Sequence, residues 1–209
     1  MDLSDEALIQ NFRQTKDPAY FKSVVRRYEN RVYSAALRIV GTAEEAEEVV
    51  QDTFMKMHQN IASFKLRSSL AAWLFRIMHN VCMDKLRSRQ RRKVFQMWSF
   101  DPSSAGSREA GEEGMHVAVN VADTSPNPSE QLAANEQEEV IERSLRALPE
   151  AQRTVVVLHD LEGFSYQEIA EIVGGSIGTV RSRLHYGRLK LRELLEPYFE
   201  SRDIAPASR

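Results

Sequence analysis

The segment SYQEIAEIVGGSIGTVRSRLHYGRLKLRELL occupies residues 165–195 and specifies how the C-terminal part of this chain folds. Ser165 and Glu168 form a capping box, which predicts that a helix begins there. Gly174 and Gly175 can adopt the positive φ of a tight turn, and Ser176 can cap a second helix. Apolar residues recur at helical spacing on both sides of the turn: Ile169, Ala170, Val173, Val180, Leu184, Leu191 and Leu195. The segment therefore predicts a helix-turn-helix.

The second helix of this segment carries polar and basic side chains away from its apolar face. Residues 176–192 hold five basic residues and no acidic one. A helix N-terminus that bears Thr179, Arg181 and Ser182 suits the major groove of DNA, where backbone amides meet phosphates and arginine bonds guanine. The alternative is a helical hairpin whose basic face is only solvated. The uninterrupted positive charge favours DNA binding.

Charge is segregated along the chain, although the net charge is only -2. Residues 63–93 contain nine basic residues and one acidic residue, a net charge of +8. Residues 99–143 contain ten acidic and two basic residues, a net charge of -8. Two basic segments separated by an acidic one predict two contacts with a polyanion.

The first 93 residues have the pattern of consecutive helices. Asp17 before Pro18 and Thr42 before Glu45 are helix start signals. Behind Thr42, apolar residues form one stripe: Ala46, Val49, Val50, Phe54, Met57 and Ile61. A further helix is expected to begin near Ser68 or Ser69 and to run into the basic segment. No window alternates with a period of two, so no sheet is expected.

Proline, glycine and serine interrupt the helical pattern after the first basic segment. We therefore expect an all-α protein of two small helical domains, residues 1–98 and 129–200, with a flexible acidic linker at 99–128 and a disordered tail at 201–209. A flexible coil of about 30 residues spans about 30 Å on average. The two domains could then lie more than one turn of DNA apart.

Several classes of protein are disfavoured by what the sequence lacks. It has no apolar run of membrane-spanning length and no secretion signal, so a cytoplasmic protein is expected. Its single cysteine, Cys82, fits helix packing in a reducing compartment. No glycine-rich nucleotide loop, metal-ligand cluster or nucleophile-base pair is apparent, so we expect no enzyme, no cofactor, no metal and no small-molecule substrate.

Two blocks of motifs resemble one family in the same order. The sequences SYQEIA (165–170) and GTVRSRL (178–184) resemble region four of the extracytoplasmic-function (ECF) sigma factors. Tyr28, AEEVVQDTF (46–54), WLFRI (73–77) and Asn80 resemble region two. The resemblance covers residues 20–93 and 130–196.

This resemblance implies a subunit that binds core RNA polymerase, directs it to promoters and helps to open the DNA. The expected partners are the coiled coil of the polymerase's largest subunit, its flap, promoter DNA, and an anti-sigma factor of a kind that can be membrane-attached. Such proteins often serve stress responses.

The resemblance also implies three groups of site residues. Core polymerase would be bound by Glu47, Glu48, Val50, Gln51, Asp52, Phe54 and Met55. The minus-ten element would be contacted by Phe64, Ser68, Ser69, Arg76, Asn80, Arg87 and Arg91. The minus-thirty-five element would be contacted by Ser165, Tyr166, Thr179, Arg181, Ser182, His185, Tyr186 and Arg188.

Some assignments have a plain structural alternative. The acids of residues 47–52 can be a solvated helix face, and Phe54 can be a core residue. Trp73 and Phe75 can stack on bases, although their spacing is also typical of a core. Arg183 can support its helix through a salt bridge. Gly187, unfavourable in a helix, indicates close approach to DNA or to a neighbouring helix.

Two positions depart from the family pattern. Leu66 stands where the family usually has glycine, and Ala72 stands where it usually has threonine. Both lie near the expected base pocket, so the bases read by this chain are not given by the resemblance.

Two other functions are compatible with parts of the sequence. A stand-alone helix-turn-helix regulator would explain residues 165–195 but would leave residues 46–54 without a role. A helical adaptor that binds only protein would have solvated basic faces and no affinity for DNA.

Overall fold

A computed structural model describes residues 3–65, 69–98 and 128–203. Within these ranges the chain is helical and contains no strand, as expected. None of the described helices is long and apolar enough to cross a membrane. The expected linker at 99–128 lies outside the described residues except for Pro128, which begins a helix.

Four helices form the N-terminal half: α1 (Asp5–Thr15), α2 (Pro18–Val40), α3 (Ala43–Asn60) and α4 (Leu70–Trp98), with a 3₁₀ turn, η1 (Ile61–Ser63), after α3. The predicted start signals are confirmed. The Asp17 side chain accepts a hydrogen bond from the Ala19 amide, and that of Thr42 accepts one from the Glu45 amide. These caps satisfy amides that the first helical turn leaves unpaired.

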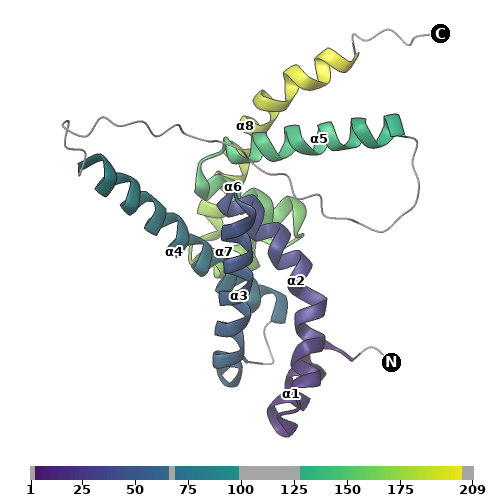
Figure 1. The fold of residues 1–209 in the computed structure, drawn as a ribbon, viewed down its shortest axis with the longest axis vertical. Coiled ribbons are helices and arrows are strands. Elements are labelled where there is room, and N and C mark those ends of the chain that lie inside the picture. The colour runs from purple at the N-terminus through teal and green to yellow at the C-terminus, as the bar shows by residue number, and fades with distance from the viewer. Residues whose placement is uncertain (1–2, 66–68, 99–127, 204–209) are drawn as a thin grey trace, which may run out of the picture.

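The apolar stripe of α3 packs on α2 and α4. Ala46, Val49 and Met57 are completely buried, together with Val32 and Leu74 from the neighbouring helices. The buried residues of α4 end at Leu86, and its basic C-terminal part projects from the body of the molecule (Figure 1).

The C-terminal half contains α5 (Pro128–Arg146), α6 (Glu150–Val156), α7 (Tyr166–Val173) and α8 (Ile177–Asp203). A π-helical turn, η2 (Val157–Leu161), continues α6 and was not predicted. Helix α8 runs through Asp203, and the rest of the tail expected at 201–209 lies outside the described residues. The outer parts of α5 and α8 extend away from the other helices (Figure 1).

The predicted helix-turn-helix is formed by α7, its turn and α8. Ser165 and Glu168 make the complete capping box, and Gly174 ends α7 with φ 65°. The Ser176 hydroxyl accepts a hydrogen bond from the Thr179 amide at 3.1 Å, which caps α8. Gly187 faces α6: a Cβ atom there would lie 2.9 Å from Cγ2 of Val156. The glycine at position 187 is therefore explained by close approach to a neighbouring helix, not by close approach to DNA.

The two halves share one core. Helix α7 packs along α4, and the ring centroids of Phe75 and Phe164 lie 4.9 Å apart. At the edge of this contact, Nε of Arg31 lies 3.0 Å from Oε2 of Glu162. Arg38 and Glu142 form a second ion pair, at 3.4 Å. The structure therefore holds the two basic segments in one closed body, although the sequence had suggested domains free to separate.

Candidate functional surfaces

The first surface is the exposed side of α8 in the helix-turn-helix. Val180 and Leu184 are buried against the rest of the C-terminal half, which fixes the rotation of α8 about its axis. That rotation leaves the predicted minus-thirty-five residues of α8 exposed: Thr179, Arg181, Ser182, His185, Tyr186 and Arg188. The arrangement can present donors and positive charge to a DNA groove.

An open hollow of about 330 Å³ lies beside this surface. It is lined by Tyr166, Arg181, Leu184, His185, Arg188, Leu189 and Arg192. Three arginines and no acidic residue line it, so the hollow favours an anionic group such as a phosphate.

Arg188 is already engaged by the π-helical turn. Its Nε donates to Oδ2 of Asp160 at 3.0 Å, its second guanidinium nitrogen bonds Oδ1, and the same nitrogen lies 3.1 Å from Nδ1 of His159. The His159 ring in turn lies 5.0 Å from the ring of Tyr166. Burial pushes the pKa of Asp160 up, but the hydrogen bonds from Arg188 and His159 outweigh it and hold the pKa below its ordinary value.

This network was missed in the sequence. His159 and Asp160 precede the capping box in a segment with no recognisable motif, and only the π-helical turn brings them to α8. Such turns are rare and recur at functional sites. Ser165 lies exposed with its hydroxyl committed to the capping box, and Tyr166 is half-buried.

The salt bridge considered for Arg183 is not found among the described residues. Arg183 instead lies near His79, which is buried on α4 at the contact between the two halves. Burial lowers the pKa of His79 below its ordinary value. The hydrogen bond with Asn80 opposes this shift, and the positive charges of Arg87 and Arg183 add to it.

The second surface is a polar stripe along α4. Arg76, Asn80, Arg87 and Arg91 are all exposed, and their spacings of 4, 7 and 4 residues put them on one side of a helix with 3.6 residues per turn. Arg87 forms an exposed ion pair with Asp84 at 3.6 Å. The stripe can follow a nucleic-acid backbone over several turns of the helix.

The aromatic residues at the start of this region are mostly internal. Phe64 is only 3% exposed, and its ring lies 5.0 Å from that of the half-buried Trp73. Phe75 is fully buried, so for this residue the core alternative holds. Ser69 is exposed and its hydroxyl accepts a hydrogen bond from the Ala72 amide at 3.3 Å. Ser68 and Leu66 lie outside the described residues.

The third surface is the outer face of α3. Glu47, Glu48 and Gln51 are exposed, Met55 is 57% exposed, and Val50 and Asp52 are half-buried. Phe54 is only 8% exposed and belongs to the core, so it does not contribute to this face. An exposed methionine beside carboxylates is a face suited to a protein partner rather than to DNA.

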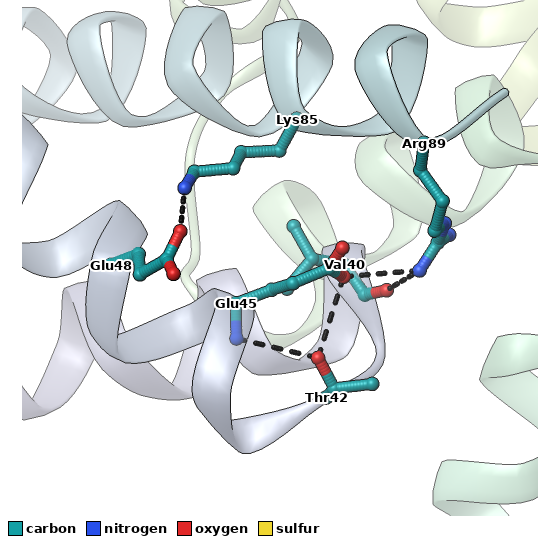
Figure 2. Close-up of polar contacts among 6 residues, drawn as sticks. All are labelled: Val40, Thr42, Glu45, Glu48, Lys85 and Arg89. Carbon is teal, nitrogen blue, oxygen red and sulfur yellow. Dashed lines mark hydrogen bonds and ion pairs between the residues drawn. The ribbon is translucent and has the colours of Figure 1, made fainter. Parts of the chain in front are cut away.

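Ion pairs attach this helix to α4. Figure 2 shows Lys85 reaching Glu48 and Arg89 reaching both Glu45 and the Val40 carbonyl. Nη1 of Arg89 lies 3.0 Å from each of these two acceptor oxygens. The pairs link α4 to α3, so the helix that carries the polar stripe and the helix that carries the outer face have a fixed relation to one another.

Two families match the two halves of the chain. Residues 24–92 match Sigma-70 region 2, and residues 138–191 match Sigma-70, region 4. The fold and these matches define a protein of the sigma-70 class.

Relatives narrow this class. The ECF RNA polymerase sigma-E factor of Haemophilus influenzae is 31% identical over 195 residues, which cover 93% of this chain and 97% of that protein. The ECF RNA polymerase sigma factor SigW of Bacillus subtilis is 30% identical, over 86% of this chain and 90% of that protein. The chain belongs to the ECF family of RNA polymerase sigma factors.

A solved structure supports the same assignment. The sigma factor RpoE of Bartonella quintana, in complex with the anti-sigma factor NepR, matches with a TM-score of 0.64 and 28% identity. The match covers 84% of this chain and 96% of that one.

Proposed function

We propose that this sigma factor binds core RNA polymerase through the outer face of α3 and contacts two promoter elements, one with α4 and one with α8. The alignment of Arg76, Asn80, Arg87 and Arg91 on a single side of α4 carries this proposal. A helix that only packs in a bundle does not require a regular row of basic and amide side chains on its exposed side. Here that row accompanies a second surface, on α8, that is suited to DNA.

The roles follow from the chemistry of each surface. Arg87 and Arg91 would hold phosphates of the minus-ten element, while Asn80 and Ser69 would bond bases of a strand that has left the stack. On α8, Arg181, Ser182 and His185 would contact the minus-thirty-five element in the major groove. The polymerase would supply the catalysis, so the sigma factor itself would not act as an enzyme, and it would work in the cytoplasm.

Restraint by an anti-sigma factor is part of the proposal. RpoE of Bartonella quintana, which this chain resembles in fold, was solved with its anti-sigma factor NepR. A protein that covers α3 or α8 of this chain would block polymerase or DNA. A stand-alone helix-turn-helix regulator is less well supported, because it leaves the region 2 match over residues 24–92 without a role.

A binding titration with core polymerase tests the assignment of α3. We expect the double variant Glu47→Lys, Gln51→Lys to bind core at least about tenfold more weakly, since it puts two cations on an acidic face. Glu138→Lys, an exposed charge reversal on α5, is the matched control and should leave the affinity unchanged. Equal affinity of the double variant and the wild type would contradict the role proposed for α3.

A further inference from the structure

One arginine of α1 binds the backbone at the end of α3. Nε of Arg13 donates to the Ile61 carbonyl at 3.0 Å. One terminal guanidinium nitrogen also bonds the carbonyls of Ile61 and Phe64 and lies 3.3 Å from that of Ala62. The guanidinium carbon lies 6.0 Å from the centre of the Phe64 ring. A single side chain from residue 13 thus holds residues 61–64.

These carbonyls need partners because they lie at a helix end. The last carbonyls of a helix commonly lack an amide partner, and its C-terminal end carries partial negative charge. Here the Ile61 carbonyl receives a long hydrogen bond from the Phe64 amide, at 3.4 Å. A planar guanidinium with five donors satisfies several carbonyls at once and brings the positive charge that this end favours.

The backbone held by Arg13 leads directly to the proposed minus-ten surface. Phe64 packs against Trp73 in the first turn of α4, with ring centroids 5.0 Å apart. That turn is capped by Ser69, and Arg76 and Asn80 follow on the exposed side of the same helix. A fixed position of the Phe64 ring therefore helps to fix the N-terminal end of α4, which packs against it.

Helix α1 does not depend on Arg13 to stay docked. Leu8, Ile9 and Phe12 are buried in the core. Asp5 also bonds the side chains of Arg27 and Tyr28 on α2. Loss of the Arg13 side chain should therefore free the backbone of residues 61–64 while α1 stays in place.

We propose that Arg13 is a positioning residue for minus-ten recognition, acting through the carbonyls of residues 61–64 and the Phe64 ring. This inference rests on the proposed function of α4. Arg13 lies before residue 24, where the match to Sigma-70 region 2 begins, so the family match assigns it no role.

The test uses holoenzyme reconstituted with core polymerase, on a promoter fragment selected with the wild-type holoenzyme. The fragment carries 2-aminopurine in the minus-ten element, whose fluorescence rises when a base leaves the stack. We expect Arg13→Met to lower the amplitude or rate of this signal about tenfold or more, as misplaced positioning groups commonly do. Core affinity and protection of the upstream duplex should remain within about twofold of wild type.

Three further variants make the test specific. Arg13→Lys keeps a positive charge but loses the planar guanidinium that bonds several carbonyls at once. Its fluorescence signal should therefore lie between those of Arg13→Met and the wild type. Arg27→Met weakens an anchor of α1 without touching residues 61–64, and Arg26→Met removes an exposed arginine of α2. Both should open DNA as the wild type does. Circular dichroism melting establishes that each variant is folded, and Arg13→Lys serves as the test if Arg13→Met does not fold.

Two results would overturn the inference. One is normal opening by folded Arg13→Met, or by Arg13→Lys if only that variant folds. The other is an equal loss in Arg27→Met, because docking of α1 would then explain the effect. A wild-type holoenzyme that opens no promoter would instead contradict the proposed function itself.

Discussion

The rings of Phe75 and Phe164 meet edge to face across the boundary between the two halves, at a centroid distance of 4.9 Å and an interplanar angle of 62°. The guanidinium of Arg31 lies over the Phe75 ring at 5.5 Å and pairs with Glu162. The contact therefore combines apolar burial with a charged rim. It holds α7 against the helix proposed to contact the minus-ten element.

We expect Phe164→Ala to loosen the closed arrangement. Truncation of a buried phenylalanine costs about 3–5 kcal/mol in a well-packed core. Small-angle X-ray scattering should give a larger radius of gyration for Phe164→Ala than for the wild type. Phe199→Ala, at an exposed position of α8, is the control. Identical scattering from the Phe164 variant and the wild type would mean that this ring does not hold the halves together.

Gly187→Ala should destabilise the C-terminal half. Alanine improves helix propensity by about 1 kcal/mol, but its methyl group would meet Val156 at 2.9 Å, and overpacking costs about 1–3 kcal/mol. We expect a net loss of about 1 kcal/mol in urea denaturation. The loss should disappear when both proteins also carry Val156→Ala, which makes room. Gly178→Ala, whose Cβ would meet nothing nearer than 3.7 Å, should not destabilise. A Gly187→Ala protein as stable as wild type would exclude the steric reason.

Asp160→Asn should lower stability by about 1 kcal/mol or less at neutral pH, the range for partly exposed ion pairs. The pKa of Asp160 is lowered in the folded state, so the ionised carboxylate stabilises the fold above the ordinary aspartate pKa. This stabilisation is lost as the pH falls through the lowered, folded-state pKa. Urea denaturation at several pH values should therefore show wild type and variant converging in acid. A difference that does not change with pH would contradict the role of the Arg188 pair.

Cys82 should be unreactive in the folded protein. Burial raises the pKa of its thiol to about 12, so almost no thiolate is present at neutral pH. Since the chain has one cysteine, labelling with a thiol reagent reports on this site alone. We expect slow labelling in buffer and rapid labelling in urea. Rapid labelling of the native protein would show that α4 opens readily around this residue.

Local patterns predicted the helix-turn-helix because its signals lie within a few residues of one another. Ser165 with Glu168, Gly174 and Ser176 all act where expected. The closed interface was not predicted, because helical spacing marks Phe75 and Phe164 as apolar without indicating that they meet. The contacts of Arg13 with backbone carbonyls have no sequence signal, since any residue can supply the acceptor.

The same reasoning explains the aromatic assignments. The resemblance to the family implied binding roles for Phe54 and Phe64, yet both are buried here. A motif indicates which residue type occupies a position. Burial then determines whether that side chain packs in the core or can contact a partner. By contrast, the exposure of Asn80, Arg87 and Arg91 follows from the rotation of α4, which its apolar residues specify.

If this chain acts as proposed, it gives core RNA polymerase the ability to start at defined promoters. Core polymerase transcribes a supercoiled genomic library with and without the purified protein, and the 5′ ends of the RNA products are sequenced. We expect the protein to produce new, discrete start sites that share two upstream sequence elements. Start sites identical to those of core polymerase alone, in the presence of folded protein, would contradict it.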